Sequence, residues 1–328
     1  MSPTQLHDFL VIAIQHKLSV LIKGAPGIGK SDIVAQACAT AGAHCLLMHP
    51  AISDPTDFKG LPARISDTEA HFLPFGDLLK LIHATEPTVC FQDDIGQAAP
   101  SVQAALMQLN LARAVNGLAI SPHVIFIGAT NDVGQMAGVS GMIEPLKSRW
   151  HTIVNLVPDA PAWLTWATAN AMPDVLTDFI RAFPQHLSAF KPTKQITNSP
   201  SPRGWAAVGR WLNASVADVE VFAGAIGEGV AVEFCAYLDM RDKIPTTEKV
   251  LSRPTTIKIP ANPSVRIALC SSLAHKVKVE ELPALFQFLD RLSADEAVAC
   301  VKHMLELRPD LKDNSSMQTF VAAHHASF

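Results

Sequence analysis

Eight consecutive residues near the N-terminus match the pattern Gly-x-x-x-x-Gly-Lys-Ser, whose residue types suit the binding of a nucleotide triphosphate. They are Gly24, Ala25, Pro26, Gly27, Ile28, Gly29, Lys30 and Ser31. The glycines let backbone N–H groups turn towards phosphate oxygens, and the following helix adds the positive end of its dipole. The lysine reaches the β- and γ-phosphates, and the serine hydroxyl ligates Mg²⁺. Because a strand-like run precedes the pattern and a helix-like run follows it, we predict an ATP and Mg²⁺ site rather than a simple glycine turn.

Two adjacent carboxylates form the second candidate site. Asp93 and Asp94 follow TVCFQ, a short apolar run that is typical of a buried strand. In a phosphate-binding fold of this kind, the acid that ends such a strand stands beside the magnesium ion bound by the serine. We therefore predict that Asp93 ligates Mg²⁺ and that Asp94 polarises the attacking water. A solvated acidic turn is the alternative interpretation of the pair.

The elements that must position these residues follow from the periodicity of apolar residues. Up to residue 157, helical patterns alternate with the short apolar runs LSVLIKG, HCLLMH, TVCFQ, HVIFIGAT and HTIVNLV. This alternation predicts an α/β domain whose parallel sheet is covered on both faces. Beyond residue 157 only helical patterns continue. They are interrupted by a linker, KPTKQITNSPSP, and by RDKIPTTEKVLSRPTTIKIPANP, which we expect to be extended.

Bulk composition argues against several classes of protein. A chain of 328 residues that is 48% hydrophobic can build one large and one smaller core. The net charge of −4 and the scattered Lys and Arg residues do not favour nucleic-acid binding. We find no apolar run of roughly 20 residues that could span a membrane and no signal-peptide layout, so we expect a cytoplasmic protein.

The six cysteines are dispersed and show no CxxC spacing. They are Cys38, Cys45, Cys90, Cys235, Cys270 and Cys300. Most of them lie in apolar runs, which indicates reduced core thiols rather than zinc ligands. Thirteen histidines are present without an HExxH motif, so we expect no metal other than Mg²⁺.

Several motifs in a consistent order resemble the AAA+ superfamily and, within it, the MoxR-like ATPases. The run VCFQDDIGQAAPSVQAALMQL resembles the second acidic motif of that group and the helix after it. DPTDFKGLP followed by FLPFGDLL resembles the segment that carries a small hairpin insert. IGATND, GVSGMIEPLKSRW and SPRGW resemble the sensor 1, arginine-finger and sensor 2 elements. These motifs span about residues 24–205, so the resemblance covers the last third of the chain only weakly.

The resemblance implies roles for three further residues. Asn131 is similar to the sensor 1 residue that orients the lytic water, and Arg203 is similar to sensor 2 on a helical lid. Arg149 is similar to the finger that a ring neighbour inserts beside the transferring phosphoryl group, with Lys147 as the competing candidate. Taken alone, each would be an ordinary turn residue or surface charge, and their order favours the functional interpretation. Arg113 either faces a neighbour or pore or is an ordinary surface charge.

The resemblance also implies a fold and an activity. The expected fold is a three-layer αβα AAA+ P-loop domain with a parallel five-stranded sheet over residues 1–157. An all-helical lid over 158–240 and a helical C-terminal extension over 241–328 follow. The expected activity is Mg²⁺-dependent ATP hydrolysis by a homo-oligomeric ring, a hexamer. The ring would remodel or activate a protein client such as a von Willebrand factor A type protein.

One residue departs from the family pattern. Asp94 stands where many members have glutamate, and its side chain is one methylene shorter. A misplacement of about 1 Å can cost on the order of a hundredfold in rate. A slow or non-hydrolysing ATP-dependent binding module therefore remains an alternative. A DNA-directed AAA+ motor is the other alternative, and the acidic charge balance counts against it.

Overall fold

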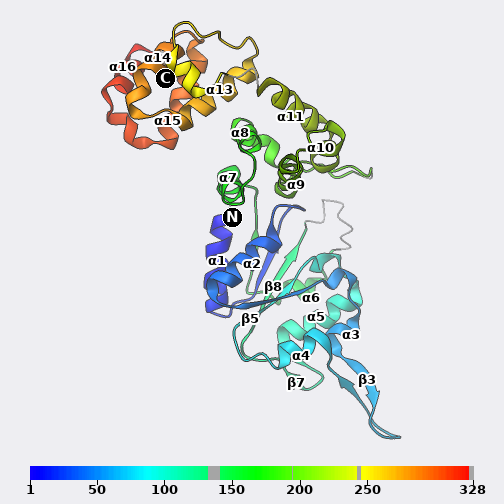
Figure 1. Ribbon diagram of the computed structural model, residues 1–328. Helices are drawn as coiled ribbons and strands as arrows, with labels where there is room; N and C mark the ends of the chain where they lie inside the picture. Colours follow the sequence, from blue (N-terminus) through cyan, green and yellow to red (C-terminus); the bar gives the residue numbers. More distant parts are fainter. Residues whose placement is uncertain (132–140, 194, 242–244, 325–328) are drawn as a thin grey trace. The chain divides into compact units, whose positions relative to one another are not determined.

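The computed structural model describes residues 1–131, 141–193, 195–241 and 245–324 (Figure 1). Parts of the IGATND and GVSGMIEPLKSRW motifs, of the linker and of the expected extended stretch lie outside these ranges. The chain divides into two compact units. Unit 1 comprises Met1–Ala162 with Ser188–Gly204, and unit 2 comprises Trp163–Leu187 with Trp205–Phe328. The division into three domains at residues 157 and 240 stays a prediction.

A parallel sheet of five strands forms the centre of unit 1. The strands are β1 (Val20–Lys23), β2 (His44–Met48), β5 (Thr88–Gln92), β8 (Val124–Thr130) and β9 (Thr152–Asn155). Their order is β2-β5-β8-β1-β9, so β1 pairs with β8 on one side and β9 on the other. Each strand lies where an apolar run predicted one. Because the strands are parallel, the loops after β1, β5 and β8 all leave the sheet at its carboxyl edge, where ligands bind in such folds.

Helices cover both faces of this sheet. On one face, α1 (Pro3–Gln15) and α2 (Lys30–Ala41) pack against the strands through an apolar cluster that includes Leu10, Val34 and Phe91. On the other face, α4 (Gly76–Ile82) and α5 (Pro100–Ala112) enclose a second cluster that includes Leu81, Leu106 and Phe126. Figure 1 shows α1 and α2 on the side of the strands opposite to α5. The predicted three-layer αβα arrangement with a parallel five-stranded sheet is confirmed.

Two small hairpins extend from unit 1. The first pairs β3 (Leu61–Arg64) with β4 (Ala70–Leu73) in antiparallel register, between α3 (Pro55–Lys59) and α4. It lies in the segment where the resemblance places a hairpin insert. The second pairs β6 (Ala114–Val115) with β7 (Leu118–Ala119) and was not predicted. Its two-residue turn, Asn116-Gly117, is a common hairpin signal that could have identified it.

Unit 2 is built from helices. They are α7 (Ala160–Ala169), which begins in unit 1, α8 (Asp174–Ala182), α9 (Pro202–Asn213), α10 (Val219–Ile226), α11 (Glu228–Arg241), α12 (Thr247–Ser252), α13 (Pro263–Lys276), α14 (Leu282–Leu289), α15 (Ala294–Leu307) and α16 (Ser315–Ala323). An aromatic group centred on Phe179 joins α8, α9 and α11. The centroids of the Trp205 and Phe234 rings lie 5.5 Å and 5.0 Å from the centroid of the Phe179 ring. A second apolar cluster joins α13 to α16. Among the helices that the structure describes, none is long and apolar enough to cross a membrane.

The expectation of an extended stretch before α13 is wrong in part. The helix α12 forms inside it, because the Thr246 side chain accepts a hydrogen bond from the Lys249 backbone N–H and caps the first turn. Val250 anchors this helix, since its side chain is fully buried against α14 and α13. Tertiary packing of one apolar residue therefore outweighs the prolines and threonines that favour an extended chain.

Candidate functional site

The glycine-rich loop connects β1 to α2 at the carboxyl edge of the sheet. Gly27 and Gly29 have φ angles of 74° and 95°, in the left-handed region that side chains other than glycine rarely adopt. The helix α2 begins directly after the loop at Lys30, so its first backbone N–H groups face the loop. The spacing of glycines in the sequence thus corresponds to backbone positions that need glycine.

Lys30 is the centre of a hydrogen-bonded chain that links three segments of unit 1. Its side chain is 7% exposed, and its ammonium group donates to the Gly24 carbonyl at 2.9 Å and the Ala25 carbonyl at 3.0 Å. It also donates to the Asn131 side-chain oxygen at 2.7 Å. The Asn131 amide nitrogen in turn donates to a carboxylate oxygen of Asp94 at 3.2 Å. The loop, the end of β8 and the end of β5 therefore meet around one buried cation.

Ser31 and Asp93 form a second contact beside this chain. The Ser31 hydroxyl donates to Asp93 Oδ2 at 2.6 Å. The Asp93 backbone N–H donates to the Met48 carbonyl at 2.9 Å, which continues the pairing of β5 with β2 and fixes where the carboxylate lies. A hydroxyl and a carboxylate at this distance are the hard oxygen ligands that Mg²⁺ prefers, with phosphate and water oxygens completing its shell. The donor set fits the predicted ion.

Asp94 is held in an unusual backbone conformation. Its φ and ψ angles are 55° and 34°, a region that costs free energy for a residue with a side chain. Burial raises the pKa of its carboxyl group, and the charge of Asp93 raises it further. The charges of Lys30, Arg203 and His49 act in the opposite direction. A carboxylate with a raised pKa is a stronger proton acceptor than an ordinary aspartate, as a general base requires.

The segment predicted to carry sensor 2 lies against the glycine-rich loop. The Arg203 backbone N–H donates to the Gly27 carbonyl at 3.0 Å. Ser201 approaches so closely that a side chain on Gly27 would have its Cβ 3.0 Å from the Ser201 hydroxyl. The Arg203 side chain is exposed, and it is close enough to influence the pKa of Asp94. Arg203 and the glycine-rich loop both belong to unit 1.

The segment predicted to carry the arginine finger is described from residue 141 on. This part is anchored, and the hydrogen-bonded chain around Lys30 does not include Arg149. Trp150 is buried against β8, where a Cβ on Gly128 would come within 2.7 Å of its ring. Arg149 donates from Nη1 to the Ser148 hydroxyl at 3.1 Å. Among the residues that the structure describes, its buried Nε has no hydrogen-bond partner. The competing candidate, Lys147, forms an ion pair with Glu144 at 2.7 Å.

Gln103 is a functional candidate that the sequence reasoning missed. It lies on the buried face of α5 with its side chain fully covered. Its amide donates to the Ala98 and Gly141 carbonyls and accepts from the Ile143 N–H at 2.9 Å. These bonds tie the start of the finger segment to α5. A glutamine on the apolar side of the helix PSVQAALMQL was the signal that could have identified it.

Arg113 has a structural role inside unit 1. Its guanidinium donates to the Ser121 carbonyl at 3.0 Å and the Val124 carbonyl at 2.8 Å, and it lies over the Phe126 ring. Burial lowers its pKa. These contacts are made within its own domain, so neither a solvated surface charge nor a group pointing towards a pore describes it.

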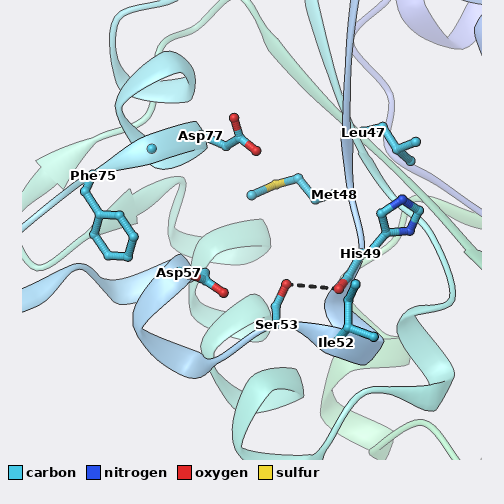
Figure 2. A pocket seen from close by; sticks show the side chains of 9 residues that line it. Leu47, Met48, His49, Ile52, Ser53, Asp57, Phe75 and Asp77 are labelled. Atoms are coloured by element: carbon cyan, nitrogen blue, oxygen red, sulfur yellow. Dashed lines mark hydrogen bonds between the residues drawn. The ribbon is translucent and has the colours of Figure 1, made fainter.

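A pocket of about 420 Å³ lies at the carboxyl end of β2 (Figure 2). Its lining consists of Leu47, Met48, His49, Ile52, Ser53, Asp57, Phe75, Gly76 and Asp77. Figure 2 shows the Asp57, Asp77 and Phe75 side chains around its interior. It shares no residue with the glycine-rich loop, and its lining residue Met48 accepts the hydrogen bond from the Asp93 N–H.

Comparisons with known proteins add little to this geometry. No protein-family model and no curated protein matches the chain. Among solved structures, a mutant of Thermotoga maritima RuvB is 18% identical over 82% of this chain and 80% of that chain, with a TM-score of 0.44. A second structure, described as the Thermotoga maritima RuvB Holliday junction branch migration motor, is 17% identical over 83% and 80%, with a TM-score of 0.41. At these values the similarity bears on neither activity nor partner. The parallel five-stranded sheet, with the glycine-rich loop after β1 and the acid pair after β5, agrees with the predicted AAA+ P-loop fold.

Proposed function

We propose that this chain binds ATP with Mg²⁺ and hydrolyses it. The observation that carries the proposal is the continuous set of contacts at the carboxyl edge of the sheet. There, Lys30, Asn131 and Asp94 form one hydrogen-bonded chain, and Ser31 and Asp93 lie beside it. A buried ammonium group, a hydroxyl and two carboxylates next to a glycine-rich loop are the parts that phosphoryl transfer from a nucleotide needs.

Each of these side chains has one task in the proposal. Lys30 binds the β- and γ-phosphates, and the loop Gly24–Gly29 cradles them with backbone N–H groups. Ser31 and Asp93 would hold Mg²⁺, which neutralises phosphate charge when it is bound. Asp94 accepts the proton of the attacking water, and Asn131 orients that water through the amide that contacts Asp94. Arg203 responds to the nucleotide from the segment that lies on the loop.

Arg149 completes the site of an adjacent copy in this proposal. Its buried Nε is unpaired among the described residues, and Lys147 is already paired with Glu144, which favours Arg149 as the finger. A residue that acts on the neighbouring subunit requires a head-to-tail ring. We infer a homo-oligomeric ring, a hexamer, that resembles the MoxR-like group. It would remodel or activate a protein client such as a von Willebrand factor A type protein. The support is the order of the motifs and the hairpin insert in the expected segment.

A titration with ATP in the presence of Mg²⁺ tests the nucleotide site. Wild type should bind ATP and release phosphate. Lys30→Ala removes a charge-assisted contact and should weaken binding by about 100-fold. Lys80→Ala is the matched control, because this lysine is exposed and pairs with Asp77 away from the loop. ATP affinity that is the same in Lys30→Ala and wild type would overturn the proposal.

A trapped complex tests the proposed client. Asp94→Asn should retain ATP and hold the client, whereas the double variant with Lys30→Ala should release it. Candidates with a von Willebrand factor A type fold are the first to be mixed with the trapped ring. Stimulation of phosphate release by DNA, with a steep dependence on salt, would instead favour the DNA-directed motor.

The slow or non-hydrolysing switch is a second candidate function. It is supported by Asp94, whose side chain is short and contacts Asn131, and whose backbone lies in the left-handed region. A glutamate at this position would reach one methylene further. If Asp94→Glu raises the rate of phosphate release without changing ATP affinity, reach limits the wild-type rate and the switch is favoured.

A further inference from the structure

Cys38 and Cys45 are brought together by a sharp reversal of the chain between α2 and β2. The helix ends at Gly42, whose φ angle of 65° turns the chain, and the Ala43 N–H donates to the Cys38 carbonyl at 2.9 Å. The strand β2 then begins at His44. The two cysteines are seven positions apart and share no motif, so sequence spacing alone did not pair them.

The side chains of both cysteines lie on the same face of the sheet. Cys38 is 1% exposed within the apolar cluster between the sheet and α2, and Cys45 packs against that cluster. Side chains alternate along a strand, and the next residue, Leu46, belongs to the cluster on the opposite face. Cys45 therefore points towards α2, which carries Cys38, and the two thiols are near enough to influence each other's pKa.

Cys45 also differs from the other cysteines in reactivity. Interaction with the Cys38 thiol lowers the pKa of Cys45, whereas the same interaction and burial raise the pKa of Cys38. Burial raises the pKa of Cys90 to about 12, and burial with nearby carboxylates raises the pKa of Cys235. The thiolate is the reactive form of cysteine. Cys45 is half-buried and Cys38 is almost fully buried, so Cys45 is the more accessible of the two to a small oxidant.

We propose that Cys38 and Cys45 are an oxidation site that forms a reversible disulfide when the protein meets a hydroperoxide. In the first step the Cys45 thiolate attacks one peroxide oxygen, the O–O bond breaks, and the leaving oxygen takes up a proton. Cys45 becomes a sulfenic acid. In the second step the Cys38 sulfur attacks the Cys45 sulfur, the S–O bond breaks, and hydroxide leaves with the Cys38 proton as water.

The electrons and atoms of these steps balance. Two thiols lose two electrons and two hydrogens, and one molecule of hydrogen peroxide is reduced to two of water. A dithiol reductant returns the pair to thiols by exchange. The new bond joins the last turn of α2 to β2, an outer strand of the sheet. The inference goes beyond the proposed ATPase function and does not depend on it.

Peptide mapping of the full-length protein after peroxide treatment tests the site. We expect a peptide pair linked through Cys38 and Cys45, with a mass lower by two hydrogens and restored by a dithiol. Cys235 is the internal control, because it is partly exposed and its pKa is raised, so Cys45 should react at least about tenfold faster. Cys270 and Cys300 also interact but are 7% and 3% exposed, and they should stay reduced.

Two variants separate the steps. In Cys38→Ser the second step is blocked, so Cys45 should accumulate as a sulfenic acid that a cyclic 1,3-dione labels. In Cys45→Ser, Cys38 should stay reduced at the same peroxide concentration. The mapping of wild type needs neither variant, so poor folding of a variant leaves the test intact. Oxidation of Cys235 before any Cys38–Cys45 link appears, or a link that forms only in denaturant, would overturn the proposal.

Discussion

Two polar regions of unit 1 differ in how far the buried nitrogens of their charged side chains have hydrogen-bond partners. At the carboxyl edge of the sheet, the Lys30 ammonium group has three acceptors within 3.0 Å, and Ser31 is paired with Asp93. In the finger segment, a buried nitrogen of Arg149 is left without a partner among the described residues. An unpaired buried polar group costs roughly 1–3 kcal/mol. The polar groups of the first region are paired within the described chain, whereas one nitrogen of Arg149 in the second region is not.

The contrast does not come from loose anchoring of the finger segment. Gln103 holds its start through two hydrogen bonds, to Gly141 and Ile143, and Trp150 holds its end in the core. A segment that is fixed at both ends, and whose arginine makes one hydrogen bond to its own neighbour Ser148, is suited to present that arginine to another molecule. The phosphate site is thus fixed by hydrogen bonds among its own charged groups, whereas the finger segment is fixed by residues on either side of Arg149.

The largest expected effect on the rate of phosphate release comes from replacing Arg149. Arg149→Ala should lower phosphate release by about a thousandfold or more, because the arginine neutralises charge only on the transferring phosphoryl group. ATP affinity should stay within about twofold of wild type. Lys147→Ala is the matched control on the same segment and should change the rate little, since this lysine is paired with Glu144.

Mixing experiments sharpen the same prediction. An Arg149→Ala chain keeps its phosphate site, and a Lys30→Ala chain keeps its arginine. Mixed rings of the two variants should therefore recover part of the activity that each lacks alone. If the mixture stays as inactive as the separate variants, Arg149 does not act on a neighbouring site.

The next largest effect concerns the proton acceptor within the first region. Asp94→Asn should lower phosphate release by about a hundredfold or more while ATP still binds. Asn131→Ala removes the amide that links Asp94 to Lys30 and should lower the rate with a smaller change in affinity. Single-turnover phosphate release measures both. Turnover equal to wild type in Asp94→Asn would remove Asp94 from the mechanism.

A pH profile should show the environment of Asp94. The residue accepts a proton only when ionised, so the rate should fall as pH falls through its pKa. Because burial and Asp93 raise that pKa, the acid limb should lie above the usual aspartate value of about 3.9. The limb should disappear in the residual activity of Asp94→Asn. A limb at or below the ordinary aspartate value would contradict the assignment.

The same pKa shift has a consequence for stability with a definite sign. A carboxyl group whose pKa is raised by folding binds its proton more tightly in the folded state than in the unfolded state. Its ionisation therefore destabilises the fold as pH rises from the unfolded pKa through the raised, folded one. Asp94→Asn should raise the melting temperature at neutral pH, by about 2–4 °C for each kcal/mol gained. Thermal unfolding at neutral and acidic pH measures the difference.

The smallest expected effect on rate tests how the finger segment is held. Gln103→Leu leaves the Ile143 N–H and the Gly141 carbonyl without their partner, at a cost of roughly 1–3 kcal/mol for each buried group. The melting temperature should fall, and turnover should fall with ATP affinity unchanged. Gln108→Leu is the control, because Gln108 is exposed on the same helix. Equal effects of the two substitutions would show that Gln103 does not position the finger.

Much of the fold could be predicted because its signals are local. Five apolar runs predicted the five strands, and the loop pattern predicted where α2 begins. The hairpin β6–β7 and the helix α12 were missed. The first depends on a two-residue turn between very short strands, and the second on burial of Val250 by distant helices. Local patterns are weak where tertiary packing decides the conformation.

The sequence by itself determined which chemical groups this protein has for phosphate binding, because the loop pattern and the acid pair are contiguous runs whose chemistry does not depend on distant residues. The tertiary structure decided which groups meet. Ser31 and Asp93 are 62 positions apart, and Lys30 and Asn131 are 101 apart. The sheet order brings them together, and the reversal after α2 pairs Cys38 with Cys45. Hydrogen bonds act over about 3 Å, so only the folded chain fixes their partners.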